Sequence, residues 1–569
     1  MVTTPIEAGG ILPLVRELTG NPDPLELYRR FSEGGRRPGT FLLESAETGA
    51  GAGERSLIGV GAALRIICTG RRVTVEALSA NGRSLLPWIG ERLTESGRFA
   101  SLSVTTAAGS HPESPERSKG PILVSQENGA LTADFPALPE IERDEATRAR
   151  LLSPLDALRT VVFGPCLLAH PIDACHLAAG VFSYDLVELF EALPAGRPEQ
   201  AETPHFEFVV PDRLVIVDHL RHRTLLVANA YGGAGSEANY HDAVRSIGDL
   251  MAAVNAAGNG ENMGKGENME KHEPAVLPQS SPFPQFSPFP VDLSDAEYAD
   301  LVVRLKQHIV AGDVFQIVAS RTFTVPCSDP LAAYARLRKA NPSPYLFYVA
   351  GRDTVVFGAS PETAVKVHGS PRRVTIRPIA GTAARGRAAG GAIDPDLDSR
   401  REAALHLDEK ETAEHMMLVD LARNDVARVS RPGTRQVTRL LTVDRYAHVM
   451  HLVSEVEGTL AEGQDALHAY TAAMNMGTLV GAPKIRAAQI LREVETSRRG
   501  AYGGAVGYLS HDGAMDTAIV IRAAVVRDGT AQVRAGAGIV FDSDPAEEAR
   551  ETRRKAEAVL RAIAGGSDG

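Results

Sequence analysis

The chain has 569 residues, of which 44% are hydrophobic and 23% charged, and its formal net charge is −11. These values are typical of a globular protein with one or a few domains, and the acidic balance argues against non-specific nucleic-acid binding. The four cysteines form no CxxC motif, which argues against a zinc knuckle or a redox pair and fits a reducing cytoplasm. There is no secretory signal pattern and no apolar run of about 18 residues, so we expect a cytoplasmic protein that does not span a membrane.

The first half of the chain alternates between helical and strand-like patterns. An amphipathic helix is predicted over 23–32, and strand-like alternation extends from 55 to 75, after the short apolar run FLLES. The other predicted elements are a helix over 153–162, a strand passing into a helix over 179–191, and a hairpin of strands 214–218 and 224–230.

The composition changes between 255 and 292. GENM occurs twice in this segment and SPFP occurs twice, among further Gly, Pro, Asn and Ser residues. Such low-complexity sequence cannot bury enough apolar surface to order itself. We therefore predict a flexible linker over 255–292 that separates two regions of comparable length, 1–254 and 293–569.

The second half opens with Ser294 and Glu297 in the arrangement of a capping box, which predicts a helix that ends at Gly312. Arg522 is placed inside an otherwise apolar predicted strand. The predicted strands cover 312–323, 341–348, 355–357, 375–382, 502–509, 518–526 and 534–540, and the predicted helices cover 408–425, 465–474 and 545–563.

Two of these helices carry the same acidic spacing. Glu411 and Glu414 are three residues apart in one helix, and Glu548 and Glu551 are three residues apart in the terminal helix, so each pair shares a helix face. Either pair alone is typical of a solvated face, but four converging carboxylates suit a hard divalent cation. The adjacent His415 lacks the ExxH spacing of di-iron sites, so the pattern favours Mg²⁺.

Several motifs of the second half resemble, in their order, those of the chorismate-utilising enzymes. These motifs are DEKETAEHMMLVDLARND, RYAHVMHLVS, NMGTLVGAPK, YGGAVGY, AIVIRAA, AGAGIV and SDPAEEARET. FLLES and FSYDLV in the first half, together with NPSPY, are similar to segments of the large components of anthranilate synthases. The resemblance implies an α+β fold in which antiparallel β-sheets pack face to face and helices lie outside. It also implies that 1–254 is a regulatory region and 293–569 the catalytic domain.

The resemblance also implies the site. Mg²⁺ would be held directly by Glu414 and Glu551, and through water by Glu411 and Glu548, and would bind the ring carboxylate of chorismate. Arg522 and Tyr502 would hold the enolpyruvyl carboxylate, and the remaining substrate-binding residues would be Gly381, Thr382, Gly536, Ala537 and Gly538. His451 matches the catalytic histidine of the family and would handle protons, while Lys484 would bind the substrate or transfer protons.

The reaction implied is the addition of ammonia at C2 of chorismate and the elimination of pyruvate to give anthranilate, the first step of tryptophan biosynthesis. Ala380 and Gln316 stand where two other branches of the family carry lysine, in aminodeoxychorismate synthases and in the isochorismate and salicylate enzymes respectively. The absence of both lysines favours the ammonia-using, pyruvate-eliminating branch. GTAARG in place of the usual GTRPRG, and Val480 in place of a small polar residue, are departures that concern local substrate contacts.

No glutaminase pattern is visible around Cys166. The resemblance therefore implies a separate glutamine amidotransferase subunit as the source of ammonia, in a heterotetramer, or free ammonium at high pH. It also implies feedback inhibition by L-tryptophan in a pocket formed by Glu44, Ser45, Pro344, Tyr345 and Leu346.

Two alternatives remain open at this point. One is an aminodeoxychorismate synthase, which the identity of the product would distinguish. The other is a tryptophan-binding scaffold with a dead site, against which the intact acidic pairs and Arg522 speak.

Overall fold

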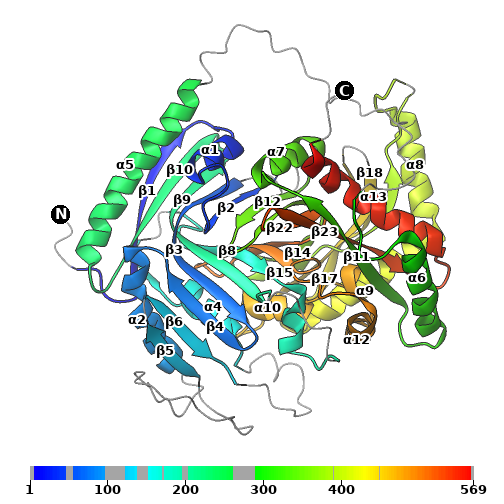
Figure 1. Cartoon of the computed structure of the whole chain (residues 1–569), viewed down its shortest axis with the longest axis horizontal. Helices are drawn as coiled ribbons and strands as arrows, with labels where there is room; N and C mark the ends of the chain where they lie inside the picture. Colours follow the sequence, from blue (N-terminus) through cyan, green and yellow to red (C-terminus); the bar gives the residue numbers. More distant parts are fainter. Residues whose placement is uncertain are drawn as a thin grey trace.

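The computed structural model describes residues 5–45, 55–95, 122–127, 129–136, 152–169, 172–194, 203–260, 289–388, 390–446 and 449–565. Strands from both halves of the chain form a continuous hydrogen-bonded network, and helices cover its outside (Figure 1). The expected α+β class is thereby confirmed. No helix in these ranges is long and apolar enough to cross a membrane. Most of the predicted linker lies outside the described residues, so its flexibility stays a prediction.

The first half contains two helices and a hairpin near the predicted positions, together with strands and helices that were not expected. Asp23 begins the first helix by accepting a hydrogen bond from the Leu25 amide. The elements are β1 (Gly10–Thr19), α1 (Pro24–Phe31), β2 (Thr40–Glu44), β3 (Arg55–Thr69), β4 (Arg72–Ala77), α2 (Ala80–Glu95), β5 (Leu123–Glu127), β6 (Ala130–Asp134), α4 (Leu155–Phe163), β7 (Cys166–Leu167), β8 (Leu177–Phe182), η1 (Tyr184–Leu189), β9 (Phe206–Asp218), β10 (Arg223–Tyr231) and α5 (Ser236–Gly260).

The second half begins with the predicted capping box, in which Ser294 and Glu297 bond each other's backbone amides. Asp544 caps the terminal helix, with Pro545 in its first turn. The elements are α6 (Asp295–Val310), β11 (Gln316–Pro326), α7 (Pro330–Ala340), β12 (Tyr345–Ala350), β13 (Val355–Ser360), β14 (Thr363–His368), β15 (Arg373–Ile376), β16 (Ile379–Ala384), α8 (Pro395–Leu407), α9 (Glu409–Ala427), β17 (Gln436–Arg445), β18 (Val449–Thr459), α10 (Ala466–Ala473), α11 (Gly477–Val480), β19 (Gly481–Ala482), α12 (Lys484–Val494), β20 (Ala505–Ser510), β21 (Met515–Ile519), β22 (Ala523–Arg527), β23 (Thr530–Ile539) and α13 (Pro545–Ala564).

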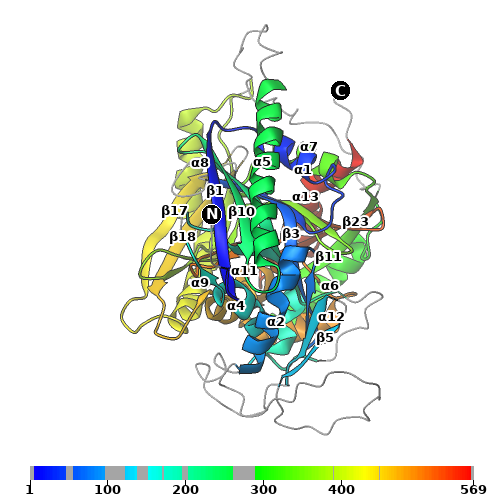
Figure 2. The ribbon, with the colours of Figure 1, turned by 90° about the vertical axis from the view of Figure 1, so that its left-hand side faces the viewer.

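The long strand β9 is the branch point of the sheets, because it pairs with β3, β8 and β10. From β3 the pairing continues through β2, β12, β13, β22 and β23 to β11, and from β8 it continues through β20, β21, β14 and β15 to β18. Among the described pairings only the short β1–β7 contact is parallel. The helix α5 lies across β1 and β10, on the outer face of this end of the molecule (Figure 2).

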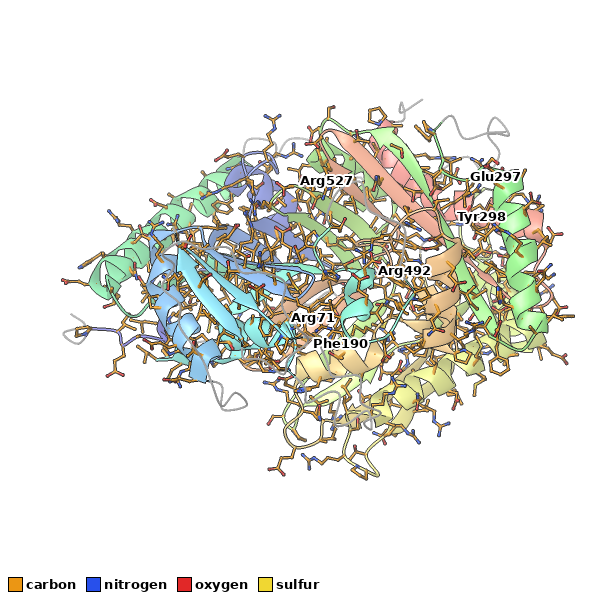
Figure 3. The ribbon with its side chains drawn as sticks, turned by 60° about the horizontal axis from the view of Figure 1, so that its bottom comes forward. Arg71, Phe190, Glu297, Tyr298, Arg492 and Arg527 are labelled. Atoms are coloured by element: carbon orange, nitrogen blue, oxygen red, sulfur yellow. The ribbon has the colours of Figure 1, made fainter. Side chains whose placement is uncertain are left out.

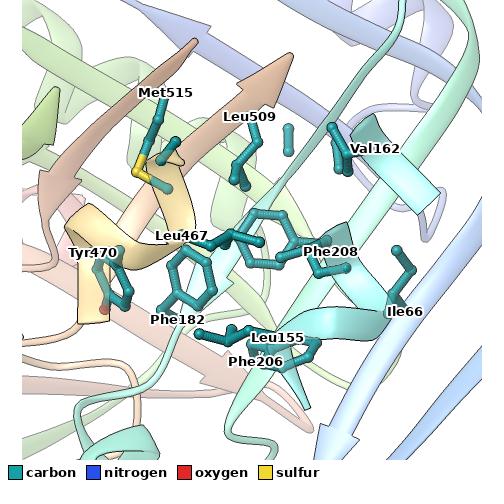
Figure 4. Packing of buried hydrophobic residues seen from close by; sticks show 14 of the residues in the cluster. Ile66, Leu155, Val162, Phe182, Phe206, Phe208, Leu467, Tyr470, Leu509 and Met515 are labelled. Carbon is teal, nitrogen blue, oxygen red and sulfur yellow. The ribbon is translucent and has the colours of Figure 1, made fainter. Parts of the chain in front are cut away.

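The two halves of the chain share both their sheets and their core. β2 of the first half pairs with β12 of the second, and β8 pairs with β20. Between these pairings, the ring of Phe182 stacks on that of Tyr470 with their centroids 4.2 Å apart, beside Phe206 and Phe208 (Figure 4). Arg492 of α12 also donates to Asp185 of η1 at 2.8 Å, where the two halves meet (Figure 3). The regulatory role of 1–254 stays a prediction.

Several sequence expectations need correction. Strand β1 and the helices α2, α5 and α12 were not predicted, and α5 runs past the proposed boundary at 254. The segment 375–382 contains parts of two strands, with Gly381 at φ 88° inside the second. Arg522 does not lie within a strand: it separates β21 from β22 and has φ 50°, in the left-handed region that disfavours side chains with a Cβ.

Candidate active site

The two acidic pairs are carried by α9 and α13, which lie far apart in sequence. Glu411 and Glu414 are half-buried in α9, while Glu548 is only 7% exposed and Glu551 half-buried in α13. The side chain of Asp408 accepts the Glu411 amide at 3.0 Å and so fixes where α9 begins. The tertiary structure therefore brings together the four carboxylates that the sequence separates into two pairs.

The pKa values of these carboxyl groups respond to one another's charge. Burial raises the pKa of Glu414, and repulsion from Glu411, Glu548 and Glu551 raises it further. Burial and the charge of Glu551 also raise the pKa of Glu411 and of Glu548. Carboxylates placed in this way destabilise one another's charged form, and a bound cation would remove that penalty.

The donor set of these four residues fits Mg²⁺, which takes carboxylate oxygens and keeps part of its water shell. With the side chains in their present positions, no three or more His, Cys, Asp or Glu groups in the described ranges close around one point at metal-binding distance. An open set of this kind agrees with a site in which substrate oxygens and waters complete the coordination. Which two residues contact the metal directly stays a prediction.

Strands β16 and β18 carry the next part of the site beside α9. The Thr382 hydroxyl and Nδ1 of His451 lie 2.8 Å apart, and a Cβ on Gly381 would come within 3.4 Å of Glu411 Oε2. Burial lowers the pKa of His451 to about 4, and the positive charge of Arg522 contributes. The imidazole is therefore neutral near pH 7, as a proton acceptor must be.

His415, the residue next to Glu414, has a supporting role. Its Nδ1 lies 2.9 Å from the Ala380 carbonyl oxygen and its Nε2 lies 2.7 Å from the Ser454 hydroxyl, and the residue is fully buried. The imidazole thus fastens α9 to β16 immediately before Gly381. It is a structural contact and not a metal ligand.

Arg522 and Tyr502 are placed close to the acidic pairs and to each other. Arg522 donates to the Lys555 carbonyl oxygen at 3.1 Å, and its charge acts on both Tyr502 and Glu551. Tyr502 is 8% exposed, and burial raises the pKa of its phenol, so it remains a neutral hydrogen-bond donor. Arg522 lies in a bend between β21 and β22, and its joint role with Tyr502 stays a prediction.

The segment 536–538 of β23 forms the close backbone approach that its glycines indicate. A Cβ on Gly536 would lie 2.9 Å from the Tyr502 hydroxyl, and one on Gly538 would lie 2.7 Å from Nε2 of Gln316. Gln316 is 7% exposed, and its Oε1 has no hydrogen-bond partner among the described residues. A buried acceptor without a hydrogen-bond partner is unusual in a folded protein.

Lys484 contacts α9 and α10, and its catalytic role stays a prediction. Its Nζ lies 2.6 Å from Asp425 Oδ2 and 2.6 Å from the Ala473 carbonyl oxygen, and its side chain is 10% exposed. Asp425 lies about three helical turns beyond Glu414 in α9. The ammonium group therefore ties α9 to the end of α10, and nothing in these contacts places it beside the acidic pairs.

Two residues that the sequence reasoning did not assign belong to the site. Nζ of Lys555 lies 2.6 Å from Glu551 Oε1 and 3.1 Å from the Gly536 carbonyl oxygen. Burial raises the pKa of Glu362 to about 8, and Lys555 and Thr478 only partly oppose the shift. Lys555 lies seven residues after Glu548 on the same helix, and this spacing could have identified it. Glu362, which follows Ser360-Pro361, has no local pattern that would identify it.

The five residues expected to bind tryptophan lie at or next to the pairing of β2 with β12. In this pairing Leu346 is the partner of Glu44. The five residues divide between two faces. The Glu44 carboxylate is buried against α7, where it accepts from Tyr334 at 2.7 Å and from Arg338 at 3.0 Å. The Tyr345 hydroxyl instead donates to Asp516 at 2.9 Å on the other face. Ser45 Oγ is buried and has no hydrogen-bond partner within the part of the chain that the structure describes, and Pro344 is buried.

Comparisons with known proteins identify the family of the chain. Residues 120–561 match the chorismate binding enzyme family. The chain is 45% identical to anthranilate synthase component 1 of Vibrio cholerae over 99% of this chain and 97% of that protein, and 42% identical to that of Escherichia coli over 95% of each.

Two solved structures have the same fold. Anthranilate synthase component I from Streptococcus pneumoniae superposes with a TM-score of 0.62, at 28% identity over 90% of this chain and 94% of that one. The menaquinone-specific isochorismate synthase of Escherichia coli superposes with a TM-score of 0.58, at 16% identity over 99% and 96%. On the sequence comparisons, the chain belongs to the chorismate-binding enzymes and, within them, to the anthranilate synthase component 1 family.

Proposed function

We propose that the chain catalyses the Mg²⁺-dependent amination of chorismate by ammonia, followed by elimination of pyruvate to give anthranilate for tryptophan biosynthesis. The observation that carries the proposal is the meeting of four carboxylates from α9 and α13 beside Arg522 and Lys555. Chorismate has two carboxylates. It therefore needs two positively charged partners, one of which is a metal held by the acidic pairs and the other a guanidinium.

The side chains divide the binding work. Glu414 and Glu551, with Glu411 and Glu548, would hold Mg²⁺, which when bound supplies Lewis-acid polarisation at the ring carboxylate. Arg522 and Tyr502 would orient the enolpyruvyl carboxylate, and the backbone of 536–538 would contact the ring. The Lys555 ammonium group spans these two parts, because it contacts both Glu551 and the Gly536 carbonyl oxygen.

Two groups have protonation states that suit the proton transfers. Amination at C2 expels the 4-hydroxyl group, which needs a proton to leave as water. Glu362, with a pKa of about 8, holds such a proton near neutral pH. Loss of the C2 proton then releases the enolpyruvyl group as enolpyruvate, which is protonated to pyruvate. His451, which is neutral near pH 7, would accept a proton.

Ammonia is the nucleophile in this proposal, and Gln316 supports the choice. Its buried, unpartnered Oε1 can accept an N–H of ammonia while leaving the nitrogen lone pair free for the ring. A carboxamide cannot deprotonate water as a lysine amine can. A separate glutamine amidotransferase subunit would supply ammonia in a heterotetramer, and L-tryptophan would inhibit through the β2–β12 junction.

The test is direct. The purified chain is incubated with chorismate, Mg²⁺ and ammonium at alkaline pH, and anthranilate fluorescence is followed together with pyruvate. We expect equal amounts of both products, no turnover without Mg²⁺, and less turnover with tryptophan. A different aromatic amine, or anthranilate without pyruvate, would contradict the proposal. Insensitivity to tryptophan would contradict only the regulatory part.

A further inference from the structure

Glu495, Arg499 and Arg534 form a buried charged cluster in the second half of the chain. Their side chains are 6%, 2% and 6% exposed. Arg499 donates to both carboxylate oxygens of Glu495, at 2.7 and 2.9 Å, and Arg534 donates to Glu495 Oε2 at 3.0 Å. Two guanidinium groups thus share one carboxylate, and the cluster carries a net positive charge.

The geometry of the cluster is closely determined. Arg499 also donates to the Val318 carbonyl oxygen at 2.6 Å and to that of Leu479. Burial opposes the charge of Glu495, but Arg499 and Arg534 outweigh it and lower the pKa of the carboxyl. The carboxylate is therefore ionised at any pH at which the enzyme would work. The excess positive charge is a permanent feature of the folded chain.

The cluster touches the proposed substrate site through Tyr502. The Arg499 guanidinium lies 5.8 Å from the centroid of the Tyr502 ring, and the Tyr502 amide donates to the Arg499 carbonyl oxygen at 3.2 Å. The Tyr502 hydroxyl borders Gly536. Ser320, which bonds both Glu495 and Arg534, pairs with Gly536 in the register of β11 and β23.

Arg499 is also fixed from the other half of the chain. Its guanidinium lies 4.6 Å from the centroid of the Tyr184 ring. The next residue, Gly500, donates to Asp185 at 2.8 Å and accepts from the Ser183 hydroxyl at 2.8 Å. The turn that carries Arg499 and Tyr502 is therefore held from both sides, and Tyr502 has little freedom to move.

Stability alone is a poor explanation for this cluster. A buried ion pair gives little net stability compared with apolar packing, and an excess buried charge costs more. An excess positive charge is favourable, however, where an anion binds close by. Of the groups that the proposed reaction brings here, the anion is the enolpyruvyl carboxylate expected at Tyr502 and Arg522.

We propose that Arg499 is a positioning residue for that carboxylate: it holds the Tyr502 ring and, with Arg534, supplies positive charge behind it. The inference rests on the proposed function. Arg499 contacts no substrate atom and acts through Tyr502. Replacing the forked guanidinium group of Arg499 should therefore weaken the binding of chorismate and leave the binding of ammonium unchanged.

The test is a double-mutant cycle of Arg499→Lys and Tyr502→Phe, with Arg498→Lys as the matched control. Arg498 is the neighbouring arginine, and it pairs with Glu188. We expect each of the first two changes to raise the KM for chorismate about tenfold, while the KM for ammonium stays within about twofold. The KM for chorismate of the double variant should be close to the higher of the two single-variant values, because Arg499 acts through Tyr502. Arg498→Lys should leave the KM for chorismate unchanged.

Additive effects, an equal rise in the KM for ammonium, or an equal effect of Arg498→Lys would overturn the inference. The inference would also be overturned if the Arg499→Lys variant melted at a lower temperature but kept the wild-type KM for chorismate. In that case Arg499 would only stabilise the fold. The wild-type assay separates the two proposals. If the wild type makes no anthranilate, the proposed function fails, and calorimetric binding of chorismate to the same variants still decides the role of Arg499.

Discussion

Nζ of Lys555 lies 2.6 Å from Oε1 of Glu551, one turn away on α13. Burial raises the pKa of the Glu551 carboxyl, but Lys555, Arg554 and Arg522 together outweigh it and lower the pKa. The pKa values of Glu411, Glu414 and Glu548 are raised instead. One carboxylate of the four is therefore neutralised within the protein. A cation that binds Glu551 must compete with Lys555, whereas the other three carboxylates attract the cation.

This relationship predicts opposite effects of Lys555→Met on metal and on catalysis. Removing the ammonium charge should tighten Mg²⁺ binding without substrate by a few-fold, as measured by calorimetry. It should also lower kcat/KM for chorismate about a hundredfold, because the contact with the Gly536 carbonyl oxygen is lost. Weaker Mg²⁺ binding in this variant would show that the lysine does not compete with the metal.

The acidic pairs predict a sharp contrast within α13. Glu551→Gln should abolish Mg²⁺-dependent turnover, because it removes a carboxylate from a site that depends on charge. Glu547→Gln is the matched control: Glu547 lies on the same helix but pairs with Arg550 and Arg554. This control should keep wild-type turnover in the anthranilate assay. Full activity of Glu551→Gln would show that the metal is held elsewhere.

Glu362 predicts a dependence of both activity and stability on pH. The pKa of its carboxyl is about 8 in the folded chain against a usual 4.5, so the folded state binds the proton more tightly. This group's contribution to stability is therefore greatest below pH 4.5 and is lost as pH rises to about 8, at up to about 1.4 kcal/mol per pH unit. If the protonated carboxyl is the acid in catalysis, kcat should fall above pH 8.

Glu362→Gln separates these two effects. The amide cannot give a proton, so kcat should fall at least about a hundredfold. It also carries no charge to bury, so the variant should be as stable as the wild type at low pH and more stable near pH 8, as measured by denaturant unfolding. A variant that is active, or that is destabilised more at high pH than at low pH, would contradict the assignment.

The hydrogen bond between Thr382 and His451 predicts a defect in turnover. Thr382→Val removes the hydroxyl that lies 2.8 Å from Nδ1, so the imidazole loses the partner that orients it. We expect kcat to fall about tenfold with the KM for chorismate within about threefold. Thr375→Val is the control, since Thr375 makes a similar contact with His368 at 3.1 Å away from the site. Equal losses in both variants would indicate a general effect on the sheets.

Much of the fold could be predicted from local pattern. The helices that begin at Ser294, Asp408 and Asp544 have side-chain caps, and each begins where the sequence places it. The elements that were missed lack such signals. α2 contains Pro87, and α5 extends into a segment with a linker-like composition. Their helical state depends on packing against strands, which no local propensity describes.

The sequence by itself determined the residue types of the site: two acidic pairs at helical spacing, glycines on a strand, and one arginine among apolar residues. Only the tertiary structure decided which of them meet. It joined the two acidic pairs across more than a hundred residues, added Lys555 and Glu362, and paired Lys484 with Asp425. The physical reason is that charge and burial depend on distance in space. Those distances are set by the pairing of β11 with β23, by the packing of α9 on β16 and β18, and by the packing of α13 on β11 and β23.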